Sequence, residues 1–102
     1  MIAEIEKHRV ELEGLCRRYR VRRLELFGSA TTAAYRPGES DIDLLVEFEV
    51  EGLPGYADRY FGLLESLEQL FGVSVDLVVA TAIKNPYLLD AVTRTKAPLY
   101  AA

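Results

Sequence analysis

Two aspartates separated by one residue, Asp41 and Asp43, stand at the start of an otherwise apolar segment. Ile42 lies between them and Leu44-Leu45-Val46 follows, so the segment has the composition of a buried strand. Side chains at i and i+2 of a strand point to the same face. Burying charge is costly unless something compensates it, and Mg²⁺ prefers carboxylate and phosphate oxygens as ligands. The spacing therefore predicts a divalent-metal site.

A glycine-serine pair, Gly28-Ser29, directly follows a second apolar segment that ends at Phe27. Glycine permits a close backbone approach, and free backbone N–H groups at such a turn bind phosphate oxygens. A phosphate-binding turn beside a metal site predicts nucleotidyl transfer.

A third acid, Asp76, lies between Val75 and Leu77 in another apolar segment. Three neighbouring carboxylates would repel one another, and one or two Mg²⁺ ions would remove that conflict. In this scheme Asp41 and Asp43 bind metal, while Asp76 binds a second ion and accepts the proton of an attacking hydroxyl. A structural aspartate, buried and capped by hydrogen bonds, is the alternative, chiefly for Asp76.

The elements that position these acids alternate between helices and strands, which predicts an α/β fold. The pattern predicts a final edge strand at 98–100 after a helix that starts at Asn85-Pro86. A helix that includes Tyr60 is expected to end at Gly72. The expected ranges are helix 3–20, strand 22–27, a helical turn over 29–34, a turn over 36–39, strand 41–49, helix 60–71, strand 73–79 and helix 86–94.

Length and composition predict one globular domain over residues 1–102. Cys16 is the single cysteine, so an internal disulfide is excluded and a reducing cytoplasm is the expected location. No signal peptide or membrane-spanning run is expected. The net charge of −4 argues against a nucleic-acid partner. Five arginines within 17–23 predict either a solvated helix end or a contact for an acidic partner, a phosphate tail or RNA.

Three segments together resemble the minimal nucleotidyltransferases of the polymerase-β-like superfamily. The resemblance implies a small mixed sheet flanked by helices, with Mg²⁺ bound by Asp41 and Asp43 and with Asp76 as the third acid. Gly28, Ser29, Thr32 and Ser40 would bind the nucleotide. The segments are Leu26-Phe27-Gly28-Ser29, Ser40-Asp41-Ile42-Asp43-Leu44-Leu45-Val46 and Val75-Asp76-Leu77-Val78.

The resemblance further implies an antitoxin that transfers AMP from ATP to a tyrosine of a HEPN-family toxin. One departure bears on activity, because the family usually carries an arginine three residues after the serine and this chain has Thr32 there. Arg36 or Lys84 is a candidate substitute for its charge. Two alternatives follow: a catalytically weak antitoxin that neutralises its partner by binding alone, or a nucleotidyltransferase acting on a small molecule or an RNA end.

Overall fold

The computed structural model describes residues 2–28, 41–49 and 55–102. The turns expected over 29–34 and 36–39 lie outside these residues. The elements, in chain order, are α1 (Ile2–Lys7), α2 (Arg9–Arg18), β1 (Val21–Phe27), β2 (Ile42–Phe48), α3 (Tyr56–Phe71), β3 (Val75–Val79), the short 3₁₀ helix η2 (Ala80–Ala82), α4 (Pro86–Thr95) and β4 (Ala97–Ala101).

The four strands form one mixed sheet in the order β3-β2-β1-β4. β1 pairs antiparallel with both β2 and β4, and β2 pairs parallel with β3. The parallel pairing requires a crossover, which α3 provides by returning the chain across the sheet. The expected small mixed sheet flanked by helices is confirmed.

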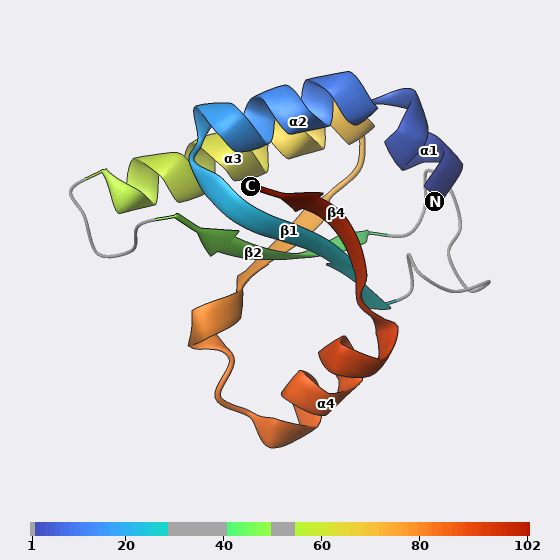
Figure 1. Ribbon diagram of the computed structural model, residues 1–102, viewed down its shortest axis with the longest axis vertical. Coiled ribbons are helices and arrows are strands. Elements are labelled where there is room, and N and C mark those ends of the chain that lie inside the picture. The colour runs from blue at the N-terminus through green and yellow to red at the C-terminus, as the bar shows by residue number, and fades with distance from the viewer. Residues whose placement is uncertain (1, 29–40, 50–54) are drawn as a thin grey trace.

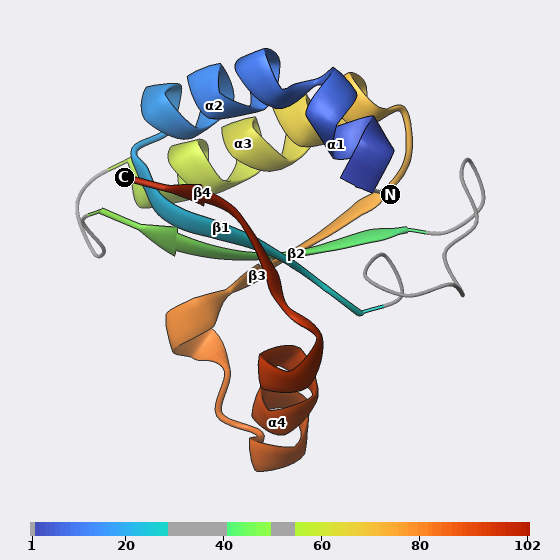
Figure 2. The same ribbon diagram turned by 45° about the vertical axis from the view of Figure 1, so that its right-hand side comes forward.

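The helices cover the two faces of the sheet unequally. α1, α2 and α3 lie together on one face, and α4 lies on the other face together with the short η2 (Figure 1, Figure 2). The larger core forms where Leu12 and Cys16 of α2 and Leu63 and Leu67 of α3 pack on the sheet. A smaller cluster of Phe27, Leu45 and Val92 joins α4 to the opposite face. β2 is therefore buried on both faces at Leu44–Val46.

Local signals predict several element ends correctly. α3 ends at Gly72, whose φ of 70° is the left-handed conformation expected of a C-terminal glycine. α4 begins at Pro86, and the side-chain Oδ1 of Asn85 accepts a hydrogen bond from the Tyr87 N–H at 2.9 Å. The predicted edge strand is β4, and within residues 2–28, 41–49 and 55–102 no further strand lies on its outer side.

The long helix expected over 3–20 is wrong as a single element. His8 separates α1 from α2 with φ −112° and ψ 19°, and the chain turns again at Tyr19 and Arg20. The His8 ring lies edge-on to Phe71 with their centroids 6.0 Å apart, so a contact with α3 coincides with the break. Within the described residues, no helix has the length and apolar character needed to cross a membrane.

Candidate active site

The two aspartates of the Asp-x-Asp motif lie at the start of β2. Asp43 is the second residue of the strand and is half-buried, whereas Asp41 precedes the strand and is exposed. Leu45, two residues after Asp43, packs in the cluster around Val92 of α4. Because side chains alternate across a strand, Asp43 lies on the face of the sheet that carries α4.

The third acid comes from the neighbouring strand. Asp76 of β3 pairs in parallel register with Asp43 of β2, so the two residues stand side by side on adjacent strands. Neighbouring strands lie about 4.8 Å apart, which brings the two carboxylates onto one patch of the sheet. Asp76 is exposed, so the alternative of a buried structural aspartate at this position is wrong.

Gly28, which directly follows β1, lies beside the carboxylate of Asp43. Phe27 pairs with Asp43 across the antiparallel strands, and Gly28 follows it with a φ of 71°. A Cβ atom at Gly28 would collide with the Oδ2 atom of Asp43. Glycine is required here both by the backbone conformation and by the close approach. The Gly28 backbone therefore lies directly against the carboxylate predicted to bind metal.

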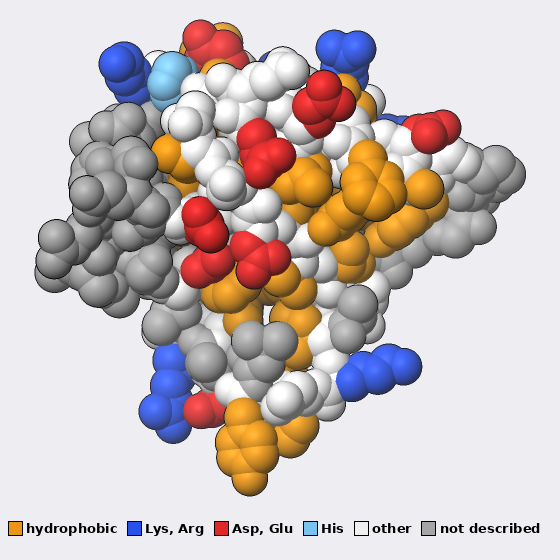
Figure 3. All heavy atoms as spheres, turned by 180° about the vertical axis from the view of Figure 1, so that it is seen from behind, with side chains coloured by type: hydrophobic (Ala, Val, Ile, Leu, Met, Phe, Trp, Pro, Cys, Tyr) orange, Lys and Arg blue, Asp and Glu red, His pale blue; other side chains and the backbone are white. Residues whose placement is uncertain are grey.

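The surroundings of Asp43 disfavour the ionised form of its carboxylate. Partial burial raises the pKa of Asp43, and the nearby negative charges of Asp76 and Asp41 raise it further. Seen from behind the view of Figure 1, acidic side chains gather near the centre of the molecule and are bordered by hydrophobic side chains (Figure 3). The site thus concentrates negative charge that a bound cation would offset.

The donor set fits a hard divalent cation, since all three candidate ligands are carboxylates. Asp43 and Asp76 are paired across adjacent strands. Their negative charges repel each other unless a positive charge lies between them. Among the described residues, however, no three acidic, histidine or cysteine side chains converge as a preformed metal centre. A cation bound here would draw the carboxylates together.

Several predicted nucleotide-binding residues lie outside the described residues, namely Ser29, Thr32 and Ser40. Arg36, one candidate to replace the missing arginine, lies outside them as well. Lys84, the other candidate, is exposed in the segment between η2 and α4.

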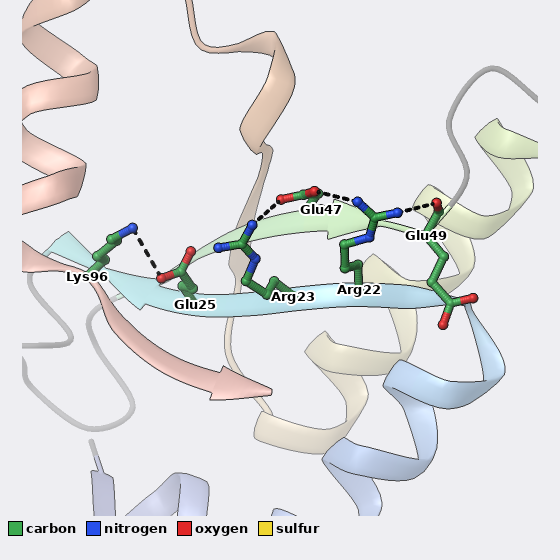
Figure 4. A network of polar contacts seen from close by, with 6 residues as sticks. All are labelled: Arg22, Arg23, Glu25, Glu47, Glu49 and Lys96. Atoms are coloured by element: carbon green, nitrogen blue, oxygen red, sulfur yellow. Dashed lines mark hydrogen bonds and ion pairs between the residues drawn. The ribbon is translucent and has the colours of Figure 1, made fainter. Parts of the chain in front are cut away.

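The arginine-rich segment divides into two parts. Arg17 and Arg18 occupy the last turn of α2, which confirms the helix-end interpretation for these two. Arg22 and Arg23 belong to β1 and contact the two carboxylate oxygens of Glu47, at 3.3 and 3.2 Å (Figure 4). Glu47 carries one negative charge against two guanidinium groups, so these ion pairs offset only part of the charge of the strand arginines.

Two contributors to the site were missed from sequence. Tyr60 and Glu68 of α3 bond to the backbone of β3 on either side of Asp76. An aromatic residue at helical spacing, such as Tyr60, is expected to pack in the core and gives no sign of a polar role. The polar role of Tyr60 becomes visible only in the structure, where α3 packs beside the edge strand β3.

Comparison with known proteins places these residues in context. A family model described as nucleotidyltransferase domain matches residues 9–97. A Methanocaldococcus jannaschii protein with the provisional name protein adenylyltransferase is 35% identical over 88 residues, covering 86% of this chain and 83% of the relative. Protein adenylyltransferase MntA of Thermococcus cleftensis is 36% identical over 78 residues, covering 76% of this chain and 72% of the relative.

Solved structures agree in fold. A chain provisionally described as a minimal nucleotidyltransferase superposes with a TM-score of 0.72 at 34% identity, covering 92% of this chain and 91% of that one. A chain from the complex of tri-AMPylated Shewanella oneidensis HEPN toxin with MNT antitoxin has a TM-score of 0.65 at 19% identity, covering 95% and 72%. The second likeness shows the fold alone.

Proposed function

This chain belongs to the nucleotidyltransferase domain family, and from that premise we propose that it transfers AMP from ATP to a hydroxyl of a partner protein. The observation that carries the proposal is the side-by-side placement of Asp43 and Asp76, with Gly28 closed against Asp43. The relatives named protein adenylyltransferases support the same reaction class.

The reaction joins the acceptor oxygen to the α-phosphorus of ATP and breaks the bond from that phosphorus to the bridging oxygen, releasing pyrophosphate. Asp41 and Asp43 would hold Mg²⁺, which neutralises triphosphate charge and stabilises the charge that develops during transfer. Asp76, exposed beside them, accepts the acceptor hydroxyl's proton. The backbone at Gly28 and the residues Ser29, Thr32 and Ser40 would bind the phosphates.

The proposed acceptor is a tyrosine of a HEPN-family toxin, which the transfer would silence, making this chain an antitoxin. Support comes from the likeness to an MNT antitoxin solved with a tri-AMPylated HEPN toxin. We also propose that residues 1–102 act as a single domain in the cytoplasm. A small domain with an exposed acidic patch suits a reaction in which the acceptor protein supplies the other wall of the site.

A second candidate is an antitoxin that neutralises its partner by binding alone. The uncharged stretch Ala30-Thr31-Thr32-Ala33 favours it, because a guanidinium near the triphosphate would supply charge-assisted hydrogen bonds that these residues lack. Transfer to an RNA end is less favoured, because the chain has a net charge of −4 and RNA binding draws on a basic surface.

Label transfer tests the proposal. Wild-type and Asp43→Asn proteins are incubated with Mg²⁺, ATP labelled at the α-phosphate and lysate of the source cells. Asp58→Asn, a change at an exposed acid in the first turn of α3, is the matched control. A labelled polypeptide formed by wild type and control but not by Asp43→Asn supports transfer. A partner that co-purifies unlabelled with all three, and stays inhibited, would favour neutralisation by binding.

A further inference from the structure

The strand that carries Asp76 lies at an edge of the sheet. Among the described residues, β3 has β2 on one side and no strand on the other. The Ser74 carbonyl accepts a hydrogen bond from the Ile42 N–H of the β2 side at 3.0 Å. Because a trans peptide points its N–H opposite to its carbonyl, the Val75 N–H faces the open edge. Such unpaired edge groups leave a strand free to fray unless something else bonds them.

Helix α3 supplies the missing partners. The Oε2 atom of Glu68 accepts a hydrogen bond from the Val75 N–H at 3.0 Å. The hydroxyl of Tyr60 donates to the Leu77 carbonyl at 2.5 Å. The two bonded positions flank Asp76, with one on each side. The edge strand is therefore fastened to α3 immediately before and immediately after its acid.

Both side chains are themselves well anchored. Glu68 lies in the last turn of α3, and its backbone carbonyl accepts the Gly72 N–H at 2.8 Å, which ends the helix. The Tyr60 ring packs half-buried against the larger core. Anchored partners on both sides of Asp76 restrict the movement of the first half of β3 along and away from the sheet.

We propose that Tyr60 and Glu68 are positioning residues that hold Asp76 in register beside Asp43. The inference rests on the proposed function, since it assigns a purpose to the bonds only if Asp76 takes part in transfer. A misplacement of about 1 Å at a reacting group can cost 100-fold in rate. Two hydrogen bonds on the open edge are the means by which this fold keeps that error small.

A second observation agrees with the placement. Burial raises the pKa of the Tyr60 phenol, and the negative charge of Asp76 raises it further. The phenol therefore lies within electrostatic range of the acid whose strand it fastens, and it keeps its proton for the bond to Leu77.

The test compares removal of each bond with matched losses elsewhere on α3 or at a residue that contacts it. Tyr60→Phe removes only the hydroxyl, and Glu68→Ala removes the acceptor. Glu68→Gln retains an oxygen that can accept from Val75. Tyr19→Phe removes a half-buried hydroxyl that lies 3.3 Å from the Ser66 Oγ of α3, and Glu65→Ala removes an exposed acid of α3.

Two readouts separate positioning from general stability. Amide hydrogen exchange in β3 is measured without nucleotide or metal, and kcat and KM for ATP are measured in the transfer assay. We expect at least tenfold faster exchange at Asp76 and Val78 in Tyr60→Phe and Glu68→Ala. We also expect at least a tenfold lower kcat with KM changed less than threefold. Glu68→Gln should restore both values to within about threefold of wild type.

Unchanged exchange in β3 for both variants, or a kcat within twofold of wild type, would overturn the inference. It would also be overturned if Tyr19→Phe and Glu65→Ala lost activity to the same extent, since general destabilisation would then explain the loss. Absence of transfer by the wild-type chain with faster β3 exchange in the variants would instead refute the proposed function, and with it the catalytic purpose of the bonds.

Discussion

The backbone of Gly28 approaches the carboxylate of Asp43 so closely that no Cβ atom fits between them. This contact joins the end of β1 to the second residue of β2. The contact sets the position of Gly28, the first residue of the predicted phosphate-binding turn, relative to Asp43, the candidate metal ligand. The relationship depends on a residue without a side chain, so it is open to direct test by adding one carbon atom.

Gly28→Ala should abolish AMP transfer and destabilise the fold. The added Cβ collides with Asp43, and the φ of 71° is unfavourable for alanine. Gly14→Ala is the matched control, because no atom lies within 4 Å of its new Cβ and alanine favours a helix by about 1 kcal/mol. Thermal unfolding and label transfer measure both effects. Transfer by Gly28→Ala at the wild-type rate would contradict the proposed role of this turn.

Asp43→Asn should raise the melting temperature of the metal-free protein while abolishing transfer. The raised pKa of Asp43 means that its ionised form is disfavoured in the folded state. Replacing the charge relieves burial cost and repulsion from Asp76 and Asp41 together. Gains of stability at the cost of activity are common at functional sites.

The same stabilisation should depend on pH in a defined direction. A group with a raised pKa in the folded state contributes to stability at low pH and loses that contribution as pH rises. The two proteins should therefore melt alike near pH 3, below the ordinary pKa of 3.8, and diverge as the pH rises above it. Thermal unfolding across this range checks it. A difference that shrinks with rising pH would contradict the assigned electrostatics.

Gly62→Ala should lower stability although alanine is the better helix former. Its Cβ would lie 2.7 Å from Cε1 of Tyr19, where α2 and α3 meet. Overpacking typically costs about 1–3 kcal/mol, which exceeds the helical gain of about 1 kcal/mol. In a Tyr19→Ala background the ring is absent, so the same substitution should become stabilising. Chemical denaturation measures this change of sign, and equal effects in both backgrounds would disprove the contact's importance.

The Cys16 thiol should resist alkylation in the native protein. Burial in the core raises its pKa to about 12, so almost no thiolate exists at pH 8. Iodoacetamide labelling followed by mass spectrometry should be slow without denaturant and fast in urea. Because the folded pKa is raised from 9.0, its contribution to stability should be present below pH 9 and lost between about pH 9 and 12. Equal labelling rates in both conditions would place the thiol outside the core.

The features predictable from sequence are those with local causes. Gly72 ends α3 because a left-handed residue follows the last turn, and Asn85-Pro86 starts α4 through a capping bond. The Asp-x-Asp strand was identifiable because acids in an apolar segment demand an explanation. The strand that carries Asp76 is predictable for the same reason, because this acid also lies in an apolar segment.

The features missed depend on contacts between distant segments. The break at His8 lies beside Phe71, some sixty residues later in the chain. The register that sets Asp43 against Asp76 depends on how β3 docks, which a strand's own composition does not specify. Tyr60 and Glu68 have ordinary helical spacing, and their role exists only once α3 lies beside the edge strand.

The mixed sheet also gives the site an order of assembly. β1 and β2 are consecutive antiparallel strands, so Gly28 and Asp43 can meet through a comparatively local pairing. β3 pairs parallel to β2 only after α3 has crossed the sheet, and such long-range pairings form late because closing the loop costs entropy. Asp76 therefore joins its partners only when α3 has docked β3 beside β2. A chain emerging from the ribosome would carry Gly28 and Asp43 before the strand that brings Asp76 has been made.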